Sequence, residues 1–463
     1  MPRHSRLVLP VLMLPLLLGL TGCGGGVDSA GPRREVPGIA SSSSPIGAAA
    51  EQATAQEADY HGWRALRLTN GMVTVVAVPD IGGRVMEYKL GGHPYLWANP
   101  AEQGKTYPQP RNEQERVWHN YGGYTLWPAP PDRWKGPPDP LGSQIDGGKW
   151  VGRIVTASGR NAEIELRSPE DKVTGLQITR SIKLFGASSQ VRITDKVTNI
   201  SQDNSDWSFV RVAQVPGALE SSAKYDEKSR LYIPVSADSK QRGGYAALEQ
   251  GGSGQFKLLP DNLLQVSYQN QKGRIGVDSQ AGWVAHVDEA HDYGFVQRFQ
   301  PTKLGDYPES GSNVIVETSG TLPYMTLGLF TPARALRPGD SYEIVTDWYA
   351  TRVGGPLVNA TEVAAIQQPL KLQRVEGKLK LTGTLGVFVP GNVAFIIQDE
   401  TGTAIGQPTT LKVSPAEVVK LNQTLPDEAT GKTVLVELQN ETGTPLGEIG
   451  KLPLSTTLAA KAD

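Results

Sequence analysis

RVMEYKLGGHPYLW, residues 84–97, alternates apolar and polar side chains, stops at two glycines, and then begins a second short run of the same kind. A Gly-Gly linker between two such runs is typical of a tight β-hairpin, because glycine adopts the positive φ angles that these turns require. The preceding segment, GMVTVVAVP (71–79), is rich in β-branched residues and predicts another strand. The pattern therefore predicts consecutive antiparallel strands.

The same alternation continues through the chain. It recurs in WVGRIVTA and NAEIELRS (150–168), LQITRSIKLF (176–185), SQVRITDKVTN (189–199), WSFVRVAQV (207–215), WVAHV (283–287), GFVQRF (294–299), NVIVET (313–318) and YEIVTDWYA (342–350). One of the few helical candidates is ATEVAAIQQPL (360–370), which Pro369 would end. So many strands predict an all-β chain, with a large antiparallel β-supersandwich at residues 57–352 and a linker at 353–369.

Residues 370–463 form a separate unit, predicted to be a small immunoglobulin-like β-sandwich. Within it, IQDETGTAIG (397–406) recurs as LQNETGTPLG (438–447). Two copies are too few for a solenoid. We interpret them as one type of hairpin turn used twice.

The N-terminus carries a secretion signal. A basic start, MPRHSR, precedes the apolar run LVLPVLMLPLLLGL and then LTGC, which resembles a bacterial lipobox in which Cys23 is acylated. The alternative is an ordinary signal peptide followed by a chance cysteine. Cys23 is the only cysteine among 463 residues, so the mature chain contains no internal disulfide.

This N-terminal pattern predicts where the protein lies. Residues 1–22 would be the signal peptide, and residues 23–56, rich in Gly, Ser, Ala and Pro, a flexible tether. Gly24 follows the cysteine in place of the aspartate associated with inner-membrane retention. We therefore predict a lipid-anchored lipoprotein of the outer membrane, with its globular part in the periplasm.

Composition and motifs exclude several partners. The net charge is −2 with no basic block, so nucleic acid is not expected as a partner. HVDEAHD (286–292) contains DEAH, but the chain has no G-x-x-x-x-G-K-(S/T) loop, and the run lacks metal-ligand spacing. It predicts a turn between two strands. No metal or other cofactor is expected, and the oligomeric state is left open.

Several longer stretches carry a resemblance. They are DIGGRVMEY (80–88), NYGGYTLWPAPPDRW (120–134), LQITRSIKL with VRITDKVTN, GFVQRF, DYPESGSNV (306–314) and LRPGDSYEIVTDWY (336–349). Together they resemble a poorly characterised bacterial family of the galactose mutarotase-like (aldose 1-epimerase-like) superfamily, over roughly residues 60–350. The resemblance implies a β-supersandwich whose concave face binds a carbohydrate.

The resemblance also implies a catalytic pair. In epimerases of this superfamily a glutamate takes the proton of the anomeric hydroxyl and a histidine protonates the ring oxygen. The glutamate is transferred to Glu317, although Val316-Glu317-Thr318-Ser319 departs from the L-E-T-Q context. The T-N-H-x-Y-type histidine motif is absent. His119 is the candidate acid by its place beside the aromatic stretch, and the alternative is a structural or surface histidine.

The aromatic stretch NYGGYTLWPAPPDRW is the predicted sugar platform. Aromatic faces pack against the C–H face of a pyranose, while their polar edges keep hydrogen-bond partners. The candidate sugar-binding residues are Tyr121, Tyr124, Trp127 and Trp134, with Asn120 at the edge of the site. The prolines predict that this segment is not a central strand. The alternative is a loop that plugs an open end of the sandwich.

Two further polar residues lie on predicted strands. Arg84 shares a sheet face with Met86, where it would bind vicinal hydroxyls or a carboxylate, or else form a salt bridge with Glu87 or another acid. Gln297 is the other candidate, on the face opposite to Arg298.

Glu317 shares its face with Ile315 and Asn313 by alternation. Facing a groove it would be desolvated and suited to act as a base; facing outward it would be a solvated charge.

Three classes of function remain open at this point. The first is a carbohydrate-binding protein on a mutarotase-like fold, without turnover. The second is a carbohydrate-active enzyme, an aldose epimerase or a relative, that uses a glutamate base. The third is an envelope scaffold. The aromatic stretch favours the first two classes, and the missing histidine motif favours binding over epimerisation.

Overall fold

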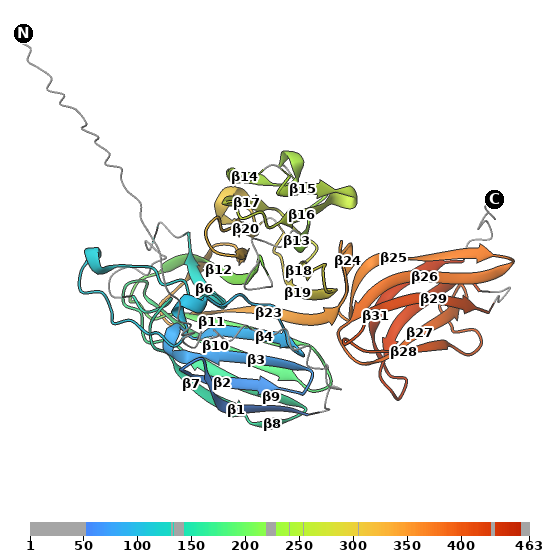
Figure 1. Cartoon of the computed structure of the whole chain (residues 1–463), viewed down its shortest axis with the longest axis horizontal. Coiled ribbons are helices and arrows are strands. Elements are labelled where there is room, and N and C mark those ends of the chain that lie inside the picture. The colour runs from blue at the N-terminus through green and yellow to red at the C-terminus, as the bar shows by residue number, and fades with distance from the viewer. Residues whose placement is uncertain are drawn as a thin grey trace, which may run out of the picture. The chain divides into compact units, whose positions relative to one another are not determined.

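The computed structural model describes residues 52–130, 133, 143–218, 228–239, 241–252, 254–303, 305–426 and 431–454. Within these ranges the regular secondary structure is almost entirely strand, as the arrows in Figure 1 show, and the strand pairs are antiparallel. The prediction of an all-β antiparallel fold is therefore confirmed. Cys23 and the predicted signal peptide lie outside the described residues.

Two large sheets make up the β-supersandwich. The first, with thirteen strands in the described chain, runs β14 (Ala246–Glu249), β17 (Gly273–Val277), β20 (Val314–Thr318), β21 (Tyr324–Phe330), β12 (Ser205–Pro216), β6 (Tyr124–Ala129), β4 (Arg84–Leu90), β3 (Val73–Val78), β2 (Trp63–Thr69), β1 (Ala53–Tyr60) and β8 (Ser158–Gly159). β22 (Arg334–Leu336) pairs with β12, and β5 (His93–Pro94) pairs with β4. The predicted Gly-Gly hairpin is confirmed, since Leu90 lies opposite His93.

The second large sheet has ten strands in the described chain. Its order is β15 (Phe256–Leu259), β16 (Leu263–Ser267), β13 (Ser229–Pro234), β18 (Trp283–Asp288), β19 (Tyr293–Phe299), β23 (Ser341–Arg352), β11 (Val191–Asn199), β10 (Leu176–Phe185), β9 (Asn161–Arg167) and β7 (Val151–Thr156). The largest hydrophobic cluster draws on both sheets. Strand β10 shows why, because every second side chain of LQITRSIKLF is buried.

One of those buried side chains in β10 is charged. The Arg180 Nε donates to the Asp195 carboxylate over 2.7 Å, and both side chains are fully buried. The Tyr124 hydroxyl donates to the other Asp195 oxygen, also over 2.7 Å, and Arg180 lies over the Tyr124 ring. A buried charge is tolerated only when it is paired and hydrogen-bonded, so this cluster ties the two sheets together through a polar contact within the core.

The C-terminal part is a sandwich of two four-stranded sheets. One contains β24 (Asn359–Ala360), β25 (Ala364–Val375), β26 (Lys378–Val387) and β29 (Val419–Leu425). The other contains β28 (Thr409–Val413), β27 (Gly391–Gln398), β30 (Thr433–Gln439) and β31 (Pro445–Pro453). Side chains from both sheets form a hydrophobic core of their own.

The repeated sequence in this sandwich is one turn used twice. The Asp399 carboxylate accepts hydrogen bonds from the backbone of Thr401 and Thr403. The Asn440 side chain does the same for Thr442 and Thr444. The interpretation of the repeat as shared turn chemistry is therefore confirmed.

The helix predicted at 360–370 is wrong. Ala360 ends β24 and residues 364–370 lie in β25, whose register against β26 shifts between Ile366 and Gln368 and again between Gln368 and Lys371. Pro369 lies within the second shift, where its missing N–H does not interrupt a regular ladder. The apolar residues that suggested a helix at 360–370 therefore belong largely to a bulged strand.

Among the described residues, the helical elements with stated bounds are single turns. They are η1 (Pro79–Ile81), η2 (Pro100–Glu102), η3 (Glu113–Glu115), η4 (Arg242–Gly244), η5 (Pro260–Asn262) and α2 (Pro308–Gly311). No helix in the described part of the chain has the length and apolar character needed to cross a membrane.

Candidate functional site

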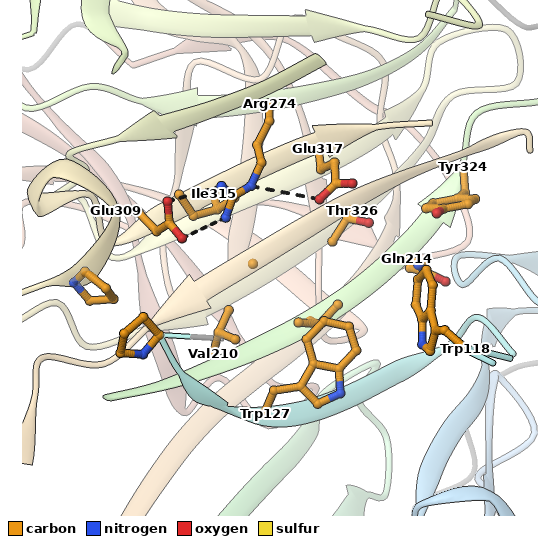
Figure 2. Close-up of a pocket in the computed structure, with 14 residues that line it drawn as sticks. Trp118, Trp127, Val210, Gln214, Arg274, Glu309, Ile315, Glu317, Tyr324 and Thr326 are labelled. Atoms are coloured by element: carbon orange, nitrogen blue, oxygen red, sulfur yellow. Dashed lines mark hydrogen bonds and ion pairs between the residues drawn. The ribbon is translucent and has the colours of Figure 1, made fainter. Parts of the chain in front are cut away.

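An open cleft of about 790 Å³ lies on one face of the thirteen-stranded sheet (Figure 2). Its lining comes from β6, β12, β17, β20 and β21 and from loops beside them: Trp118, Trp127, Pro130, Val210, Val212, Gln214, Arg274, Pro308, Glu309, Ile315, Glu317, Tyr324, Thr326 and Gly328. A volume of this size suits a small-molecule ligand.

Strand alternation explains which residues face the cleft. On β20, Ile315 and Glu317 line it, whereas Val314 and Val316 belong to the core between the two large sheets. The same division holds on β21, where Thr326 faces the cleft and Leu327 faces the core. One face of the sheet is therefore committed to the core and leaves the other for a ligand.

Register across four strands places polar side chains in one row. Glu317 lies opposite Arg274 on β17 and opposite Thr326 on β21, and Thr326 lies opposite Gln214 on β12. Residues directly opposite each other in a sheet are near neighbours, so these four side chains form a continuous polar line. The next row is apolar, with Ile315, Gly328 and Val212 at matching positions.

Trp118 and Trp127 lie beside these two rows of the sheet, with ring centroids 6.5 Å apart and ring planes at 71°. A single carboxylate holds both, because Asp146 accepts from the Trp127 indole N–H over 2.7 Å and from the Trp118 indole N–H over 3.2 Å. Asp146 is itself buried and pairs with the guanidinium of Arg84. The orientation of both indoles therefore depends on one buried ion pair.

Glycine makes that pairing sterically feasible. Gly82 has φ 77°, and a Cβ at this position would lie 2.0 Å from the Asp146 carbonyl oxygen. Only glycine permits both the left-handed conformation and the close approach. Gly82 therefore allows the segment that carries Asp146 to approach the start of β4.

Arg274 and Glu309 form the other end of the cleft. The guanidinium donates two hydrogen bonds to the Glu309 carboxylate, over 2.9 and 3.1 Å, and its Nε lies 4.0 Å from a Glu317 oxygen. Figure 2 shows Arg274 between the two carboxylates. Glu309 has φ 55° and Ser310 φ 62°, values that are uncommon for non-glycine residues and that often occur at binding sites.

Glu317 has the electrostatics of a partly desolvated acid. Burial raises the pKa of its carboxyl group, the charges of Arg274 and Lys272 act in the opposite direction, and Glu249 raises it further. Its side chain is 42% exposed, towards the cleft that it lines. Burial also raises the pKa of Tyr324, whose ring stacks on Trp97. A ligand in the cleft would therefore meet a carboxyl group whose pKa is raised by burial.

The prediction that the aromatic stretch avoids a central strand is wrong. Strand β6 lies between β4 and β12, with Pro128 opposite Phe209. The Phe209 backbone N–H donates to the Thr331 hydroxyl, and the Phe209 carbonyl accepts from the Thr331 backbone N–H, so both groups point away from β6. Pro128 therefore occupies a non-hydrogen-bonded position opposite Phe209, and its missing N–H removes no hydrogen bond between β6 and β12. On its second edge β6 pairs with β4 only at Tyr124.

His119 lies outside the cleft. It lines a neighbouring cavity of about 90 Å³, where its ring stacks on Tyr107 with centroids 3.4 Å apart and its Nδ1 lies 3.6 Å from a Glu102 oxygen. Trp118 lines both cavities. The structure therefore does not bring His119 and Glu317 into one cavity, and the catalytic role of His119 stays a prediction.

The other predicted binding residues are spread over several places. Trp127 lines the cleft, Arg84 is buried against Asp146, and Tyr124 is buried in the core. Tyr121 is buried and lines the smaller cavity; Asn120 is buried beside it in the chain.

Two of these predicted residues have no described place in the cleft. Gln297 is buried on β19, in the ten-stranded sheet. Trp134 lies outside the described residues.

The predicted turn in HVDEAHD is confirmed between β18 and β19. Asp288 caps it, because its carboxylate accepts from the backbone of Ala290 and His291. Burial lowers the pKa of His286 to about 4, so this histidine is neutral at physiological pH. In the described part of the chain no cluster of three or more His, Cys, Asp or Glu residues is arranged to hold a metal ion.

Sequence reasoning missed much of the lining, namely Trp118, Gln214, Arg274 and Tyr324, and Asp146 behind it. Trp118 offered a signal, because it directly precedes His119 in the aromatic region. The other residues lie on separate strands and turns, and no local sequence motif indicates which of these strands pair.

Fold and cleft together define an all-β protein with an open, aromatic-walled cleft on a sheet face. The chain belongs to the family described as a domain of unknown function (DUF4380), whose model matches residues 64–351. None of the curated proteins matches the chain.

Solved structures provide further comparisons. A galactose mutarotase-like protein from Clostridium acetobutylicum is 13% identical over 65% of this chain and 98% of its own, with a TM-score of 0.40. A galactose mutarotase-like protein from Lactobacillus casei is 9% identical over 62% and 99%, with a TM-score of 0.42. A putative aldose 1-epimerase from Klebsiella pneumoniae is 13% identical over 64% and 83%, with a TM-score of 0.43.

Proposed function

We propose that the cleft binds a carbohydrate. The observation that carries this proposal is the pairing of two indoles, Trp118 and Trp127, with a polar row on the sheet floor. A pyranose has an apolar C–H face and a rim of hydroxyls, so it needs both kinds of surface at once. An apolar ligand would leave Gln214, Thr326 and Glu317 without partners, at a cost in free energy.

Replacing Trp127 with alanine is expected to weaken binding of the recognised glycan. Losing the buried contact of one large aromatic removes about 1.5–3 kcal/mol, which corresponds to a rise of roughly 10- to 150-fold in Kd. A panel of neutral, basic and acidic glycans identifies the ligand of the full chain in detergent, and titration calorimetry then compares the two proteins.

Tyr107→Ala is the matched control, because Tyr107 is an aromatic residue of the smaller cavity and is 38% exposed. Its affinity should equal that of the wild-type protein. No binding to any glycan in the panel would refute the proposal and favour a scaffold role.

An enzymatic role for the same cleft is the second candidate. Glu317 favours it, since a carboxyl group with a raised pKa inside a ligand cleft suits a general base. Polarimetry of the bound sugar with wild-type protein tests it: an unchanged rate of mutarotation, together with the absence of any cleavage product, leaves binding alone.

We also propose that Cys23 carries a lipid anchor in the outer membrane, on the basis of LTGC and the lone cysteine. Cys23→Ser should release the protein from the membrane fraction, because the acyl chains supply the anchoring free energy. Cell fractionation and immunoblotting measure the distribution. Membrane association that persists in this variant contradicts the anchor, and Val151→Ala, an exposed change in β7, serves as the control.

A further inference from the structure

We infer that the cleft selects carbohydrates that carry a protonated amine, that is, amino sugars, over neutral and acidic ones. This inference rests on the proposed function and adds the chemical class of the ligand. It follows from an imbalance in the lining, where the indole and terminal guanidinium donors are already used within the protein and the Glu317 carboxylate is not.

The strong donors around the cleft are engaged within the protein. Both indole N–H groups, of Trp118 and Trp127, donate to Asp146. The two terminal nitrogens of the Arg274 guanidinium donate to Glu309. A ligand that offers mainly acceptors, such as a carboxylate or a sulfate, would therefore have to displace an existing ion pair.

One acceptor of the lining is exposed to the cleft, the carboxylate of Glu317, whose side chain is 42% exposed. No described residue donates a hydrogen bond to the Glu317 carboxylate, and the nearest guanidinium nitrogen is 4.0 Å away. A ligand that desolvates this carboxylate must supply a donor in place of water, so a donor from the ligand would be stabilising.

Charge points in the same direction. Two carboxylates, of Glu309 and Glu317, flank the single guanidinium of Arg274 in the lining, which leaves one net negative charge. The aromatic rings of Trp118, Trp127 and Tyr324 border the same space and attract cations through their faces. An ammonium group brings three donors and a positive charge, and so matches both features.

Three tetrasaccharides with the same β-1,4 linkage test the inference. One consists of glucosamine, one of N-acetylglucosamine and one of glucose, so that they differ only at carbon 2. With the full chain in detergent at pH 6.5, we expect the glucosamine oligomer to bind at least about tenfold more tightly than the other two, the usual scale of a charge-assisted hydrogen bond.

The variant Glu317→Gln keeps the shape of the side chain and removes its charge. It should reduce the preference for the glucosamine oligomer over the two neutral oligomers to within about threefold. Glu441→Gln, on the C-terminal sandwich and 79% exposed, makes the same change in net charge and should leave the preference intact.

The pH dependence of the affinity provides a second test of the role of Glu317. The groups that face Glu317 are Arg274, Lys272, Glu249, Glu309 and Tyr324. Since the pKa of Glu317 is raised, affinity for the glucosamine oligomer should increase as pH rises through that pKa, and fall again as the amine deprotonates at about pH 8. The Glu317→Gln variant should lose only the rise in affinity at acidic pH and keep the fall at alkaline pH.

The outcomes separate the inference from the proposed function. Equal or tighter binding of the glucose or N-acetylglucosamine oligomer overturns the amino-sugar preference and leaves carbohydrate binding intact. A preference that survives in Glu317→Gln also overturns it, because the charge would then lie elsewhere. Failure of all three oligomers and of the wider glycan panel overturns both.

Discussion

Replacing Asp146 with alanine is expected to lower the free energy of unfolding by about 3–5 kcal/mol and to abolish measurable glycan binding. The change leaves the buried guanidinium of Arg84 without its carboxylate, which is the costly way to break a buried ion pair. It also removes the acceptor for the indoles of Trp118 and Trp127. Urea unfolding and calorimetric titration measure the two effects.

Asp146→Asn separates the two roles of this residue. The amide keeps an acceptor oxygen for one indole and loses the charge, so we expect it to fall between wild type and Asp146→Ala in both measurements. A loss of stability below about 0.5 kcal/mol in the alanine variant would show that Arg84 does not depend on Asp146. Stability lost with unchanged affinity would show that the indoles hold their positions without the carboxylate.

Replacing Asp195 with alanine should have a similarly large effect, about 3–5 kcal/mol, on stability. Arg180 would remain fully buried without its ion-pair partner, and the Tyr124 hydroxyl would lose its acceptor. Thermal and urea unfolding measure the loss. The matched control is Asp347→Ala, which breaks the more exposed pair with Arg192 and should cost about 1 kcal/mol or less.

Equal losses in the Asp195 and Asp347 variants would contradict this account of the core. If Asp195→Ala does not accumulate as folded protein, Tyr124→Phe provides the measurement, because it removes only the hydroxyl donor. We expect about 1.5–3 kcal/mol for that change, the usual net value of a hydrogen bond to a charged group.

Much of the fold was predictable because strands carry their signal locally. Alternation of side chains in LQITRSIKLF and the Gly-Gly linker after Leu90 depend only on the pleat and on turn geometry. The two wrong predictions both concern proline. Pro128 and Pro369 are accommodated in strands by a non-hydrogen-bonded position and by a register shift, and neither arrangement follows from the proline's own neighbours.

The candidate site was less predictable, since its parts meet only through sheet register. Trp127 and Glu317 were selected from local motifs and lie in the cleft. Gln214 and Arg274 sit on strands whose sequences read as ordinary sheet, and the row they form with Glu317 depends on which strands pair. His119 was chosen for its place in the chain beside the aromatic stretch, but it faces a separate cavity.

The sequence by itself determined the class of fold, because the two-residue period of strands is a property of neighbouring residues. It also determined which side chains share a face, as Ile315 and Glu317 do. Only the tertiary structure decided which face became the cleft and which the core. That choice depends on long-range packing: Val314 and Val316 meet the second sheet, and Asp146, brought close by Gly82, orients the indoles on the open side.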